Sequence, residues 1–201
     1  MTTLCYAKKT CSIGIHVLLE ELGVDYDLKI VDFSKAEQKT PEYKAINPKG
    51  KVPALVRDDG SVLTEYAAIA LWLAMTHPER KLLPGDPEGI ARTVEATDFV
   101  VGTVHMLSWR LWRRPDAYSD NPEEHEQLRN RGQAAMLAAL EVVDAQLEGK
   151  EFIGGSHVGL ADILLFCFLT FGANVGQPLN PDNANVSAWF ERMQGRPSAA
   201  A

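Results

Sequence analysis

The stretch that decides the fold reads Asn47-Pro48-Lys49-Gly50-Lys51-Val52-Pro53-Ala54-Leu55-Val56, and Leu63-Thr64-Glu65 follows it. Proline fixes its own backbone and biases the preceding residue away from helix, and glycine supplies a positive φ, so residues 47–50 predict a turn. A strand over residues 52–56 comes next. Asp58-Asp59-Gly60 then predicts a tight hairpin that returns antiparallel through Val62 and Leu63.

The residues on either side of this hairpin suggest a ligand site. Pro53 removes one ladder donor, which a sheet tolerates at the first position of a strand or on an edge. A cis Val52-Pro53 bond would leave the Val52 amide and carbonyl free for a ligand, but cis bonds are uncommon, so composition alone does not support one. A helix over residues 65–76 follows, and its first-turn amides can hold an anion.

Composition indicates a globular protein. The 201 residues are 46% hydrophobic and 23% charged, enough for one large or two small cores. No apolar run approaches the length of about 20 residues that a membrane span needs, and the first residues lead directly into a strand, so we expect a cytoplasmic protein. The net charge of -7 disfavours nucleic acid and anionic membranes as partners.

The cysteines point to one candidate reactive thiol. Cys5, Cys11 and Cys167 are an odd number without metal-ligand spacing, and the histidines are scattered, so we expect neither a disulfide framework nor a metal site. Cys11 lies where a strand gives way to a helix, and a helix N-terminus lowers the pKa of a thiol. An inert buried thiol is the alternative for Cys11, and packing is the expected role of the other two.

The order of elements predicts two domains. Residues 1–76 give strand, helix, strand, short helix, hairpin and helix, which build a four-stranded mixed sheet of thioredoxin type with its first two strands parallel. Residues 77–87 carry prolines and Gly85 and are predicted to be a linker. Residues 88–201 are predicted to be all-helical, with helices over about 88–114, 123–147, 160–171 and 185–194.

Two features of the helical part bear on function and stability. His105, Trp109 and Trp112 recur at helical spacing and should share one face of the helix, part of which we expect to line a cleft. Two roles stay open for Trp109, packing in the core and lining an electrophile pocket. The apolar helix over residues 160–171 should be buried on several sides. Asp162 occupies its N3 position, where a carboxylate can accept from first-turn amides or reach back to the N-cap.

These motifs together resemble the bacterial glutathione S-transferases, and most closely the beta class, over essentially the whole chain. The motifs that carry the resemblance are Tyr6-Ala7, Cys11-Ser12, the run from Asn47 to Leu55, Leu63-Thr64-Glu65 and Ala161-Asp162. The resemblance implies a thioredoxin-like N-terminal domain, an all-α C-terminal domain and a homodimer. It also implies glutathione as co-substrate along the N-domain edge, with no further cofactor.

The resemblance assigns roles to individual residues of the first domain. Cys11 matches the cysteine that faces the glutathione sulfur, and Val52, before the family's cis proline Pro53, pairs its backbone with the cysteinyl group. Glu65 holds the γ-glutamyl ammonium while nearby amides take the carboxylate. Lys35 lies within one residue of the family's lysine for the glycyl carboxylate.

Other positions match or depart from the family. Tyr66 replaces the usual Ser or Gly; its amide can still serve, while its bulky ring can narrow the pocket. Gly102-Thr103-Val104-His105 matches a segment that lines the site, and Asp98 replaces an asparagine that often reaches the partner subunit's glutathione. Gly159 stands where most members have Ser or Thr as the N-cap.

The sequence therefore predicts an enzyme that transfers the sulfur of reduced glutathione to a small hydrophobic electrophile, as in detoxification. Thiol-disulfide or peroxide-reducing chemistry through Cys11 is a possible addition. The alternative is a non-catalytic protein of the same fold that binds glutathione or apolar ligands. A plain thioredoxin-type reductase is disfavoured, because the chain lacks a C-x-x-C motif and one thiol cannot resolve its own mixed disulfide.

Overall fold

The structure is a computed structural model that describes residues 1–174, 180 and 182–200. The chain forms two compact units. The first comprises Met1–Leu83 together with the described residues from Arg196 onward, and the second comprises Pro84–Gly195. The boundary between residues 83 and 84 lies inside the segment 77–87 that the sequence predicts as a linker. The C-terminal end, expected in the helical domain, belongs to the first unit.

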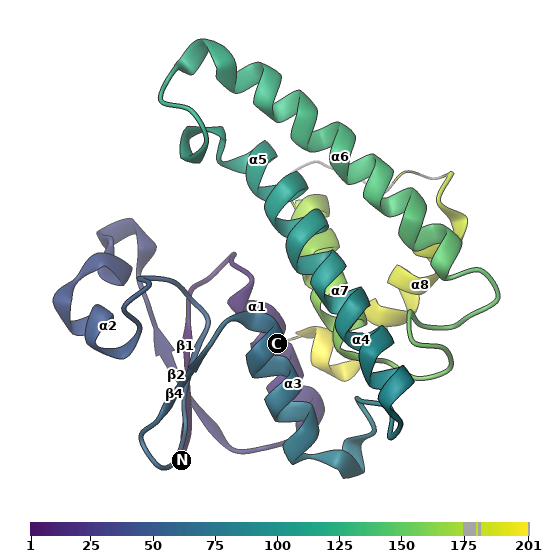
Figure 1. The fold of residues 1–201 in the computed structure, drawn as a ribbon, viewed down its shortest axis with the longest axis horizontal. Helices are drawn as coiled ribbons and strands as arrows, with labels where there is room; N and C mark the ends of the chain where they lie inside the picture. The colour runs from purple at the N-terminus through teal and green to yellow at the C-terminus, as the bar shows by residue number, and fades with distance from the viewer. Residues whose placement is uncertain (175–179, 181, 201) are drawn as a thin grey trace. The chain divides into compact units, whose positions relative to one another are not determined.

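A four-stranded mixed sheet organises the first unit (Figure 1). Its strands are β1 (Thr2–Tyr6), β2 (Tyr26–Ile30), β3 (Ala54–Val56) and β4 (Val62–Thr64). The spatial order is β2-β1-β3-β4, with β1 parallel to β2, and with β3 antiparallel to both β1 and β4. A helix joins β1 to β2, which is why this pair can be parallel. The predicted thioredoxin-like topology is confirmed.

Three helices accompany this sheet: α1 (Ser12–Leu22), α2 (Pro41–Ile46) and α3 (Tyr66–Thr76). Single 3₁₀ turns lie at Phe33–Lys35, Glu37–Lys39 and Pro78–Arg80. The core forms between the sheet and the helices, where Leu4, Leu55 and Ile69 are completely buried. Helix α1 ends at Gly23, whose φ of 63° is the left-handed conformation that glycine adopts without strain.

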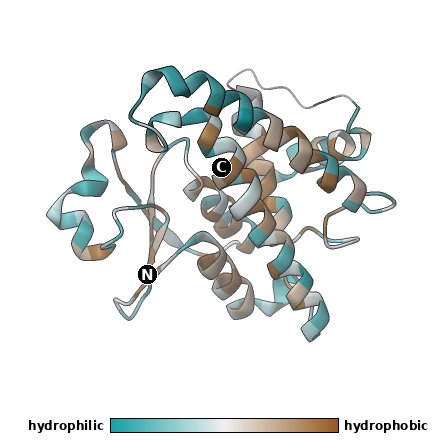
Figure 2. Ribbon diagram, turned by 45° about the horizontal axis from the view of Figure 1, so that its top comes forward, coloured by the Kyte–Doolittle hydropathy of each residue, from teal (hydrophilic) through white to brown (hydrophobic). Residues whose placement is uncertain are grey.

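The second unit is helical, as predicted. Its α-helices are α4 (Pro87–Phe99), α5 (Arg110–Arg113), α6 (His125–Gln146), α7 (Leu160–Asn174) and α8 (Ala184–Gln194), with 3₁₀ turns at Pro115–Ala117 and Pro122–Glu124. Helix α7 is buried on several sides, and Ile163, Leu164 and Leu165 have no exposed surface. In Figure 2 the hydrophobic residues gather on the helices inside this unit, whereas the N-terminal half of α6 is hydrophilic. Within the described part of the chain, no helix is long and apolar enough to cross a membrane.

The helix predicted over residues 88–114 changes its winding in the middle. Between α4 and α5, Val100–Trp109 is π-helical, and we call it the π-helical segment. Its hydrogen bonds reach five residues back instead of four, and the Ser108 hydroxyl also donates to the carbonyl oxygen of Thr103 at 2.8 Å. A face assigned from α-helical spacing therefore does not continue unchanged through this segment.

The C-terminal end is held to the first unit by an ion pair. The Arg196 guanidinium donates two hydrogen bonds of 2.7 Å to the Glu21 carboxylate, and the Ser198 hydroxyl donates to the same group. Burial raises the pKa of Glu21, but these hydrogen bonds outweigh burial, so the pKa lies below the usual value. The pair therefore stabilises the unit at neutral pH, and this contribution is lost as the pH falls through the lowered pKa.

Candidate functional site

Cys11 lies at the turn between β1 and α1, as the sequence predicts. It is the N-cap residue of α1, and its side chain is partly exposed. Its Sγ lies 3.7 Å from the carbonyl oxygen of Val52, within the range of an S–H···O hydrogen bond. The structure thus brings together two predicted site residues that are far apart in the sequence. The bond between Val52 and Pro53 is cis.

A buried hydroxyl network fixes the turn that carries Cys11. Ser12 is completely buried, and its Oγ accepts the Ala7 N–H at 3.0 Å and lies 2.7 Å from Thr10 Oγ1. The Thr10 hydroxyl in turn donates to the Ala7 carbonyl oxygen at 2.8 Å. Cys11 therefore sits between two residues whose side chains are already committed to the backbone, which preorganises its position. This role of Thr10 and Ser12 was not predicted from the sequence.

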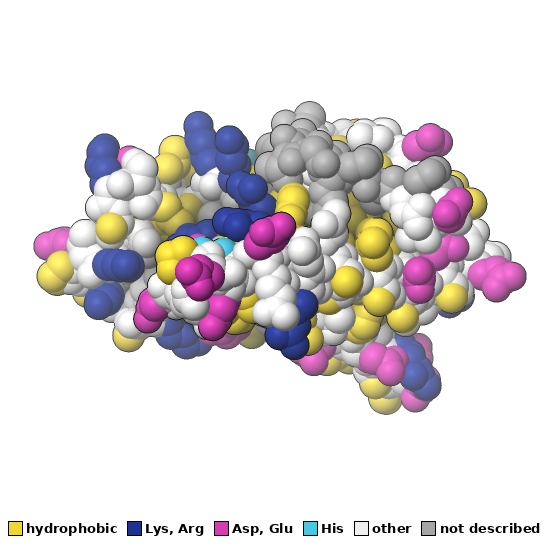
Figure 3. All heavy atoms as spheres, turned by 90° about the horizontal axis from the view of Figure 1, so that it is seen from above, with side chains coloured by type: hydrophobic (Ala, Val, Ile, Leu, Met, Phe, Trp, Pro, Cys, Tyr) yellow, Lys and Arg dark blue, Asp and Glu magenta, His cyan; other side chains and the backbone are white. Residues whose placement is uncertain are grey.

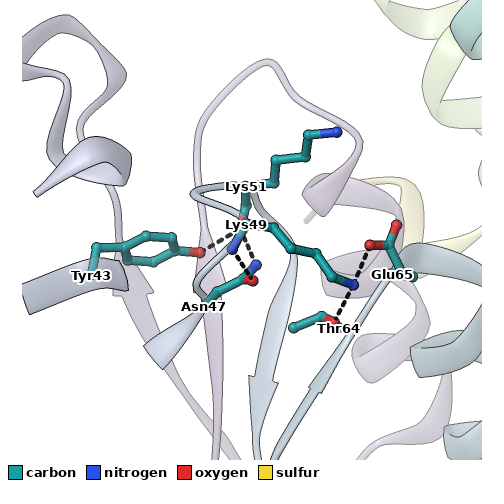
Figure 4. Close-up of polar contacts among 6 residues, drawn as sticks. All are labelled: Tyr43, Asn47, Lys49, Lys51, Thr64 and Glu65. Carbon is teal, nitrogen blue, oxygen red and sulfur yellow. Dashed lines mark hydrogen bonds and ion pairs between the residues drawn. The ribbon is translucent and has the colours of Figure 1, made fainter. Parts of the chain in front are cut away.

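Hydrogen bonds of buried side chains stabilise the turn at residues 47–50 (Figure 4). Asn47 is buried; its side-chain amide donates to the Lys51 carbonyl oxygen at 2.7 Å, and its Oδ1 accepts the Lys49 N–H at 3.2 Å. The Tyr43 hydroxyl donates to the same Lys51 carbonyl at 2.7 Å. Gly50 has a φ of 61°, and a Cβ there would lie 2.8 Å from the Gln38 carbonyl oxygen, so glycine is needed at this point. These residues direct the chain toward Val52.

Glu65 lies between β4 and α3 in an unusual backbone conformation. Its φ is 72° and its ψ is 130°, which costs a non-glycine residue on the order of 1–3 kcal/mol, and strained residues of this kind cluster at active sites, ligand clamps and switch regions. Its carboxylate is exposed, and Lys49 Nζ lies 2.5 Å from Glu65 Oε1 and 2.9 Å from Thr64 Oγ1 (Figure 4). Glu65 was a predicted site residue, but Lys49 was not. The available signal was a lysine inside the turn that precedes the candidate site.

Tyr66, the first residue of α3, turns its ring into the first unit. Only 6% of the residue is exposed, and its Cε2 lies 2.8 Å from where a Cβ at Gly14 of α1 would stand. The sequence raised the concern that this bulky ring narrows a pocket. In the structure the ring instead fills the space that is free because Gly14 has no side chain.

This packing predicts the effect of adding one methyl group at Gly14. Gly14→Ala should destabilise the protein by about 1–2 kcal/mol, because overpacking against Tyr66 exceeds the gain of about 1 kcal/mol in helix propensity. In a Tyr66→Ala background the ring is absent, and the same substitution should become stabilising. Urea unfolding of the four proteins measures both effects. The same sign in the two backgrounds would contradict the proposed contact.

Lys35 ends the 3₁₀ turn Phe33–Lys35, and its side chain is 74% exposed. Its ammonium lies 3.3 Å from the Asp32 carboxylate, which also accepts the Ser34 N–H at 2.9 Å. Hydrogen bonds from the Ser34 hydroxyl, at 2.6 Å, and from the Ser34 N–H hold the pKa of Asp32 below its usual value, and the Lys35 ammonium adds to the effect. The structure thus places Lys35 on the surface as the partner of Asp32. To bind a ligand carboxylate, the Lys35 ammonium would have to leave the Asp32 carboxylate.

In the second unit, the remaining predicted site residues lie close together along the chain. Asp98 is exposed near the end of α4, and the other predicted residues, Gly102, Thr103, Val104, His105 and Trp109, all lie in the π-helical segment. Val104 is completely buried, so it presents no surface to a ligand. The His105 ring stacks on Phe168 of α7 with centroids 4.5 Å apart, and Trp109 packs edge-on against Trp112 at 5.4 Å.

Comparison with known protein families identifies both parts of the chain. Residues 10–76 match the glutathione S-transferase N-terminal domain, and residues 67–197 match the glutathione S-transferase C-terminal domain. Glutathione S-transferase GstA of Escherichia coli O157:H7 is 34% identical over 197 residues, which cover 96% of this chain and 93% of that protein.

Solved structures agree with this result. A glutathione transferase homologue from Sulfitobacter with bound glutathione has a TM-score of 0.90 at 28% identity and covers 100% of this chain and 95% of its own. A glutathione S-transferase from Xylella fastidiosa has a TM-score of 0.90 at 29% identity, covering 100% and 96%. The chain therefore belongs to the glutathione S-transferase family of enzymes.

Proposed function

We propose that this chain is a glutathione transferase of beta-class type, which binds reduced glutathione on its first unit and transfers the sulfur to a small hydrophobic electrophile. The observation that carries the proposal is the approach of Cys11 Sγ to within 3.7 Å of the Val52 carbonyl. This places a thiol beside a backbone group that can pair with the cysteinyl part of the tripeptide. The bound glutathione in the Sulfitobacter homologue supports the same assignment.

Different residues of the first unit would bind the different parts of the tripeptide. Val52 would pair with the cysteinyl backbone, and Glu65 would accept from the γ-glutamyl ammonium. The amides of the first turn of α3 would face the γ-glutamyl carboxylate, and Lys35 would meet the glycyl carboxylate. Figure 3 shows Lys and Arg side chains together with Asp and Glu side chains on one face of the molecule, so both signs of charge are present on the surface despite the net charge of -7.

Cys11 offers two chemistries to a sulfur placed beside it. Its thiol can donate a hydrogen bond to the glutathione thiolate and so stabilise the nucleophile that attacks the electrophile. Alternatively, the Cys11 thiolate can attack the glutathione sulfur of a mixed disulfide between glutathione and a substrate thiol, forming a Cys11–glutathione disulfide and releasing the substrate thiolate. Reduced glutathione then attacks the Cys11–glutathione disulfide, which regenerates Cys11 and releases glutathione disulfide.

In the second unit, Trp109 would contribute to the electrophile pocket. Asp98, Gly102, Thr103 and His105 of the same helix would position the second substrate, whereas the buried Val104 would support them from within the unit. Because π-helical stretches occur frequently at functional sites, the winding of Val100–Trp109 is in keeping with this role.

The test of the glutathione site is the substitution Glu65→Gln. It removes the charge that would hold the ligand ammonium, so affinity should fall by about 1.5–3 kcal/mol, or roughly tenfold to 150-fold. Calorimetric titration with glutathione measures the change, and circular dichroism checks the fold. Glu42→Gln on α2 is the matched control, since Glu42 is also exposed in the first unit. Unchanged affinity in Glu65→Gln would remove Glu65 from the site.

We also propose a homodimer with isologous contacts. Exposed apolar side chains of the second unit support it, namely Val94, Leu107, Leu137 and Val142. Asp98, exposed on α4, would then be able to reach the glutathione of the other subunit. Light scattering at micromolar concentration should give twice the mass of the chain, and a monomer would contradict both the dimer and the shared site.

A further inference from the structure

The Lys49–Glu65 ion pair is the feature of the first unit that the proposed function leaves unexplained. The two side chains come from different elements, the turn before Val52 and the residue before α3, and meet at 2.5 Å (Figure 4). They are 49% and 64% exposed, respectively. An exposed ion pair contributes little to stability, because water screens the attraction and two long side chains lose freedom. Stability alone is therefore a weak reason for this arrangement.

An ammonium next to a carboxylate is the chemical complement of a zwitterionic amino acid. Glu65 can accept hydrogen bonds from an α-ammonium, and Lys49 can donate to the α-carboxylate on the same carbon. We propose that Lys49 is a binding residue for the α-carboxylate of the γ-glutamyl group, so that Lys49 and Glu65 together recognise the free amino-acid end of the ligand. This inference rests on the proposed function and adds a specificity-determining residue to it.

The surrounding geometry favours Lys49 as the charged donor. The Tyr66 side chain is turned against Gly14 and the residue is only 6% exposed, so the ring directly after Glu65 does not occupy the surface beside the ion pair. Lys49 Nζ also lies 2.9 Å from the Thr64 hydroxyl, which keeps the ammonium beside the start of α3. The Glu65 carboxylate, on a residue whose φ of 72° is strained, meets the same ammonium at 2.5 Å.

Ligand binding would replace the Lys49–Glu65 ion pair by two others, one between Glu65 and the ligand α-ammonium and one between Lys49 and the ligand α-carboxylate. The α-ammonium would take the position that Lys49 Nζ occupies at Glu65, and the flexible lysine stem would let the ammonium follow the α-carboxylate. Every charge keeps a partner in this exchange. A ligand that lacks either group would leave Lys49 or Glu65 without its new partner, and this is the physical basis of discrimination.

The experiment compares three ligands by calorimetry on the full chain. These are glutathione, glutaryl-cysteinyl-glycine, which lacks the α-ammonium, and 4-aminobutyryl-cysteinyl-glycine, which lacks the α-carboxylate. Lys49→Met should weaken glutathione about tenfold or more but change the affinity of the 4-aminobutyryl peptide by less than about twofold. Lys49→Arg should restore most of the preference for the carboxylate. Lys29→Met, on the exposed edge strand β2, is the control with the same loss of charge and should behave as wild type.

Two results would overturn the assignment of Lys49 while leaving the glutathione site intact. An equal loss for all three ligands would mean that Lys49 only holds Glu65 in place. Tighter glutathione binding by Lys49→Met would mean that the lysine competes with the ligand ammonium. If wild type bound none of the three peptides, the proposed function itself would fail, and this outcome is distinct from both.

Discussion

Replacing Asp162 with Ala should lower the free energy of unfolding by about 3–5 kcal/mol. The Asp162 carboxylate is 1% exposed and accepts three hydrogen bonds. Oδ1 accepts the Ile153 N–H at 2.9 Å and the Trp189 Nε1–H at 2.7 Å, and Oδ2 accepts the Gly159 N–H at 2.9 Å. Alanine would leave the buried Trp189 indole N–H and the two partly buried backbone N–H groups without this acceptor. The loss is a large share of the 5–15 kcal/mol that stabilises a typical domain.

Two variants make this experiment specific. Asp162→Asn keeps the shape but turns an amide N–H₂ toward one of the donors, so its loss should be intermediate. Glu141→Ala removes an exposed carboxylate from α6 and should change stability by less than about 0.5 kcal/mol. Urea unfolding monitored by circular dichroism gives all three values. A loss below about 1 kcal/mol in Asp162→Ala would show that the three hydrogen bonds do not hold this unit together.

Of the contacts that Asp162 makes, the sequence predicts the local one but not the one to another helix. Its position at N3 of a helix predicts a bond to the first turn, and the bond to the Gly159 N–H is the kind expected. Trp189 lies 27 residues further on, in a different helix, and no local pattern links the two. Spacing predicts contacts along one element. Contacts between elements depend on tertiary packing, which a single sequence does not display.

The same distinction applies to the fold. The thioredoxin-like sheet was predictable, because turn residues and period-2 alternation are local signals. The π-helical winding of Val100–Trp109 was not, because a change from i→i+4 to i→i+5 hydrogen bonds needs no particular composition. The face predicted for His105 and Trp109 was derived from α-helical spacing. In the structure they contact different partners, Phe168 and Trp112.

At the candidate site, the motif indicated Cys11, Val52 and Glu65, and the structure places the first two in contact. Lys49 was missed because a lysine in a turn is ordinarily solvated, and only the fold shows that its ammonium reaches Glu65. The placement of Tyr66 likewise depends on Gly14, a residue of another helix. Local chemistry thus suggested the reactive groups, whereas their partners required the folded chain.

Replacing Cys11 with Ser should abolish glutathione adduct formation while retaining most of the affinity for glutathione. Serine can still donate a hydrogen bond to the glutathione sulfur, but it cannot form a disulfide. Intact mass measured after incubation with glutathione disulfide should therefore show an adduct in wild type and none in Cys11→Ser. Thiol-disulfide exchange should disappear with the adduct, and part of any conjugating activity should remain.

Cys5 supplies the matched control for this experiment, because it is a thiol of the same unit in a different environment. It is completely buried in β1, and burial raises the pKa of its thiol, so the reactive thiolate is disfavoured there. Cys5→Ala should keep the adduct, with some loss of stability. Undiminished exchange in Cys11→Ser would show that Cys11 is not the redox nucleophile. If wild type formed no adduct, the hydrogen-bonding role would remain, and conjugation assays would then decide between a transferase and a binding protein of the same fold.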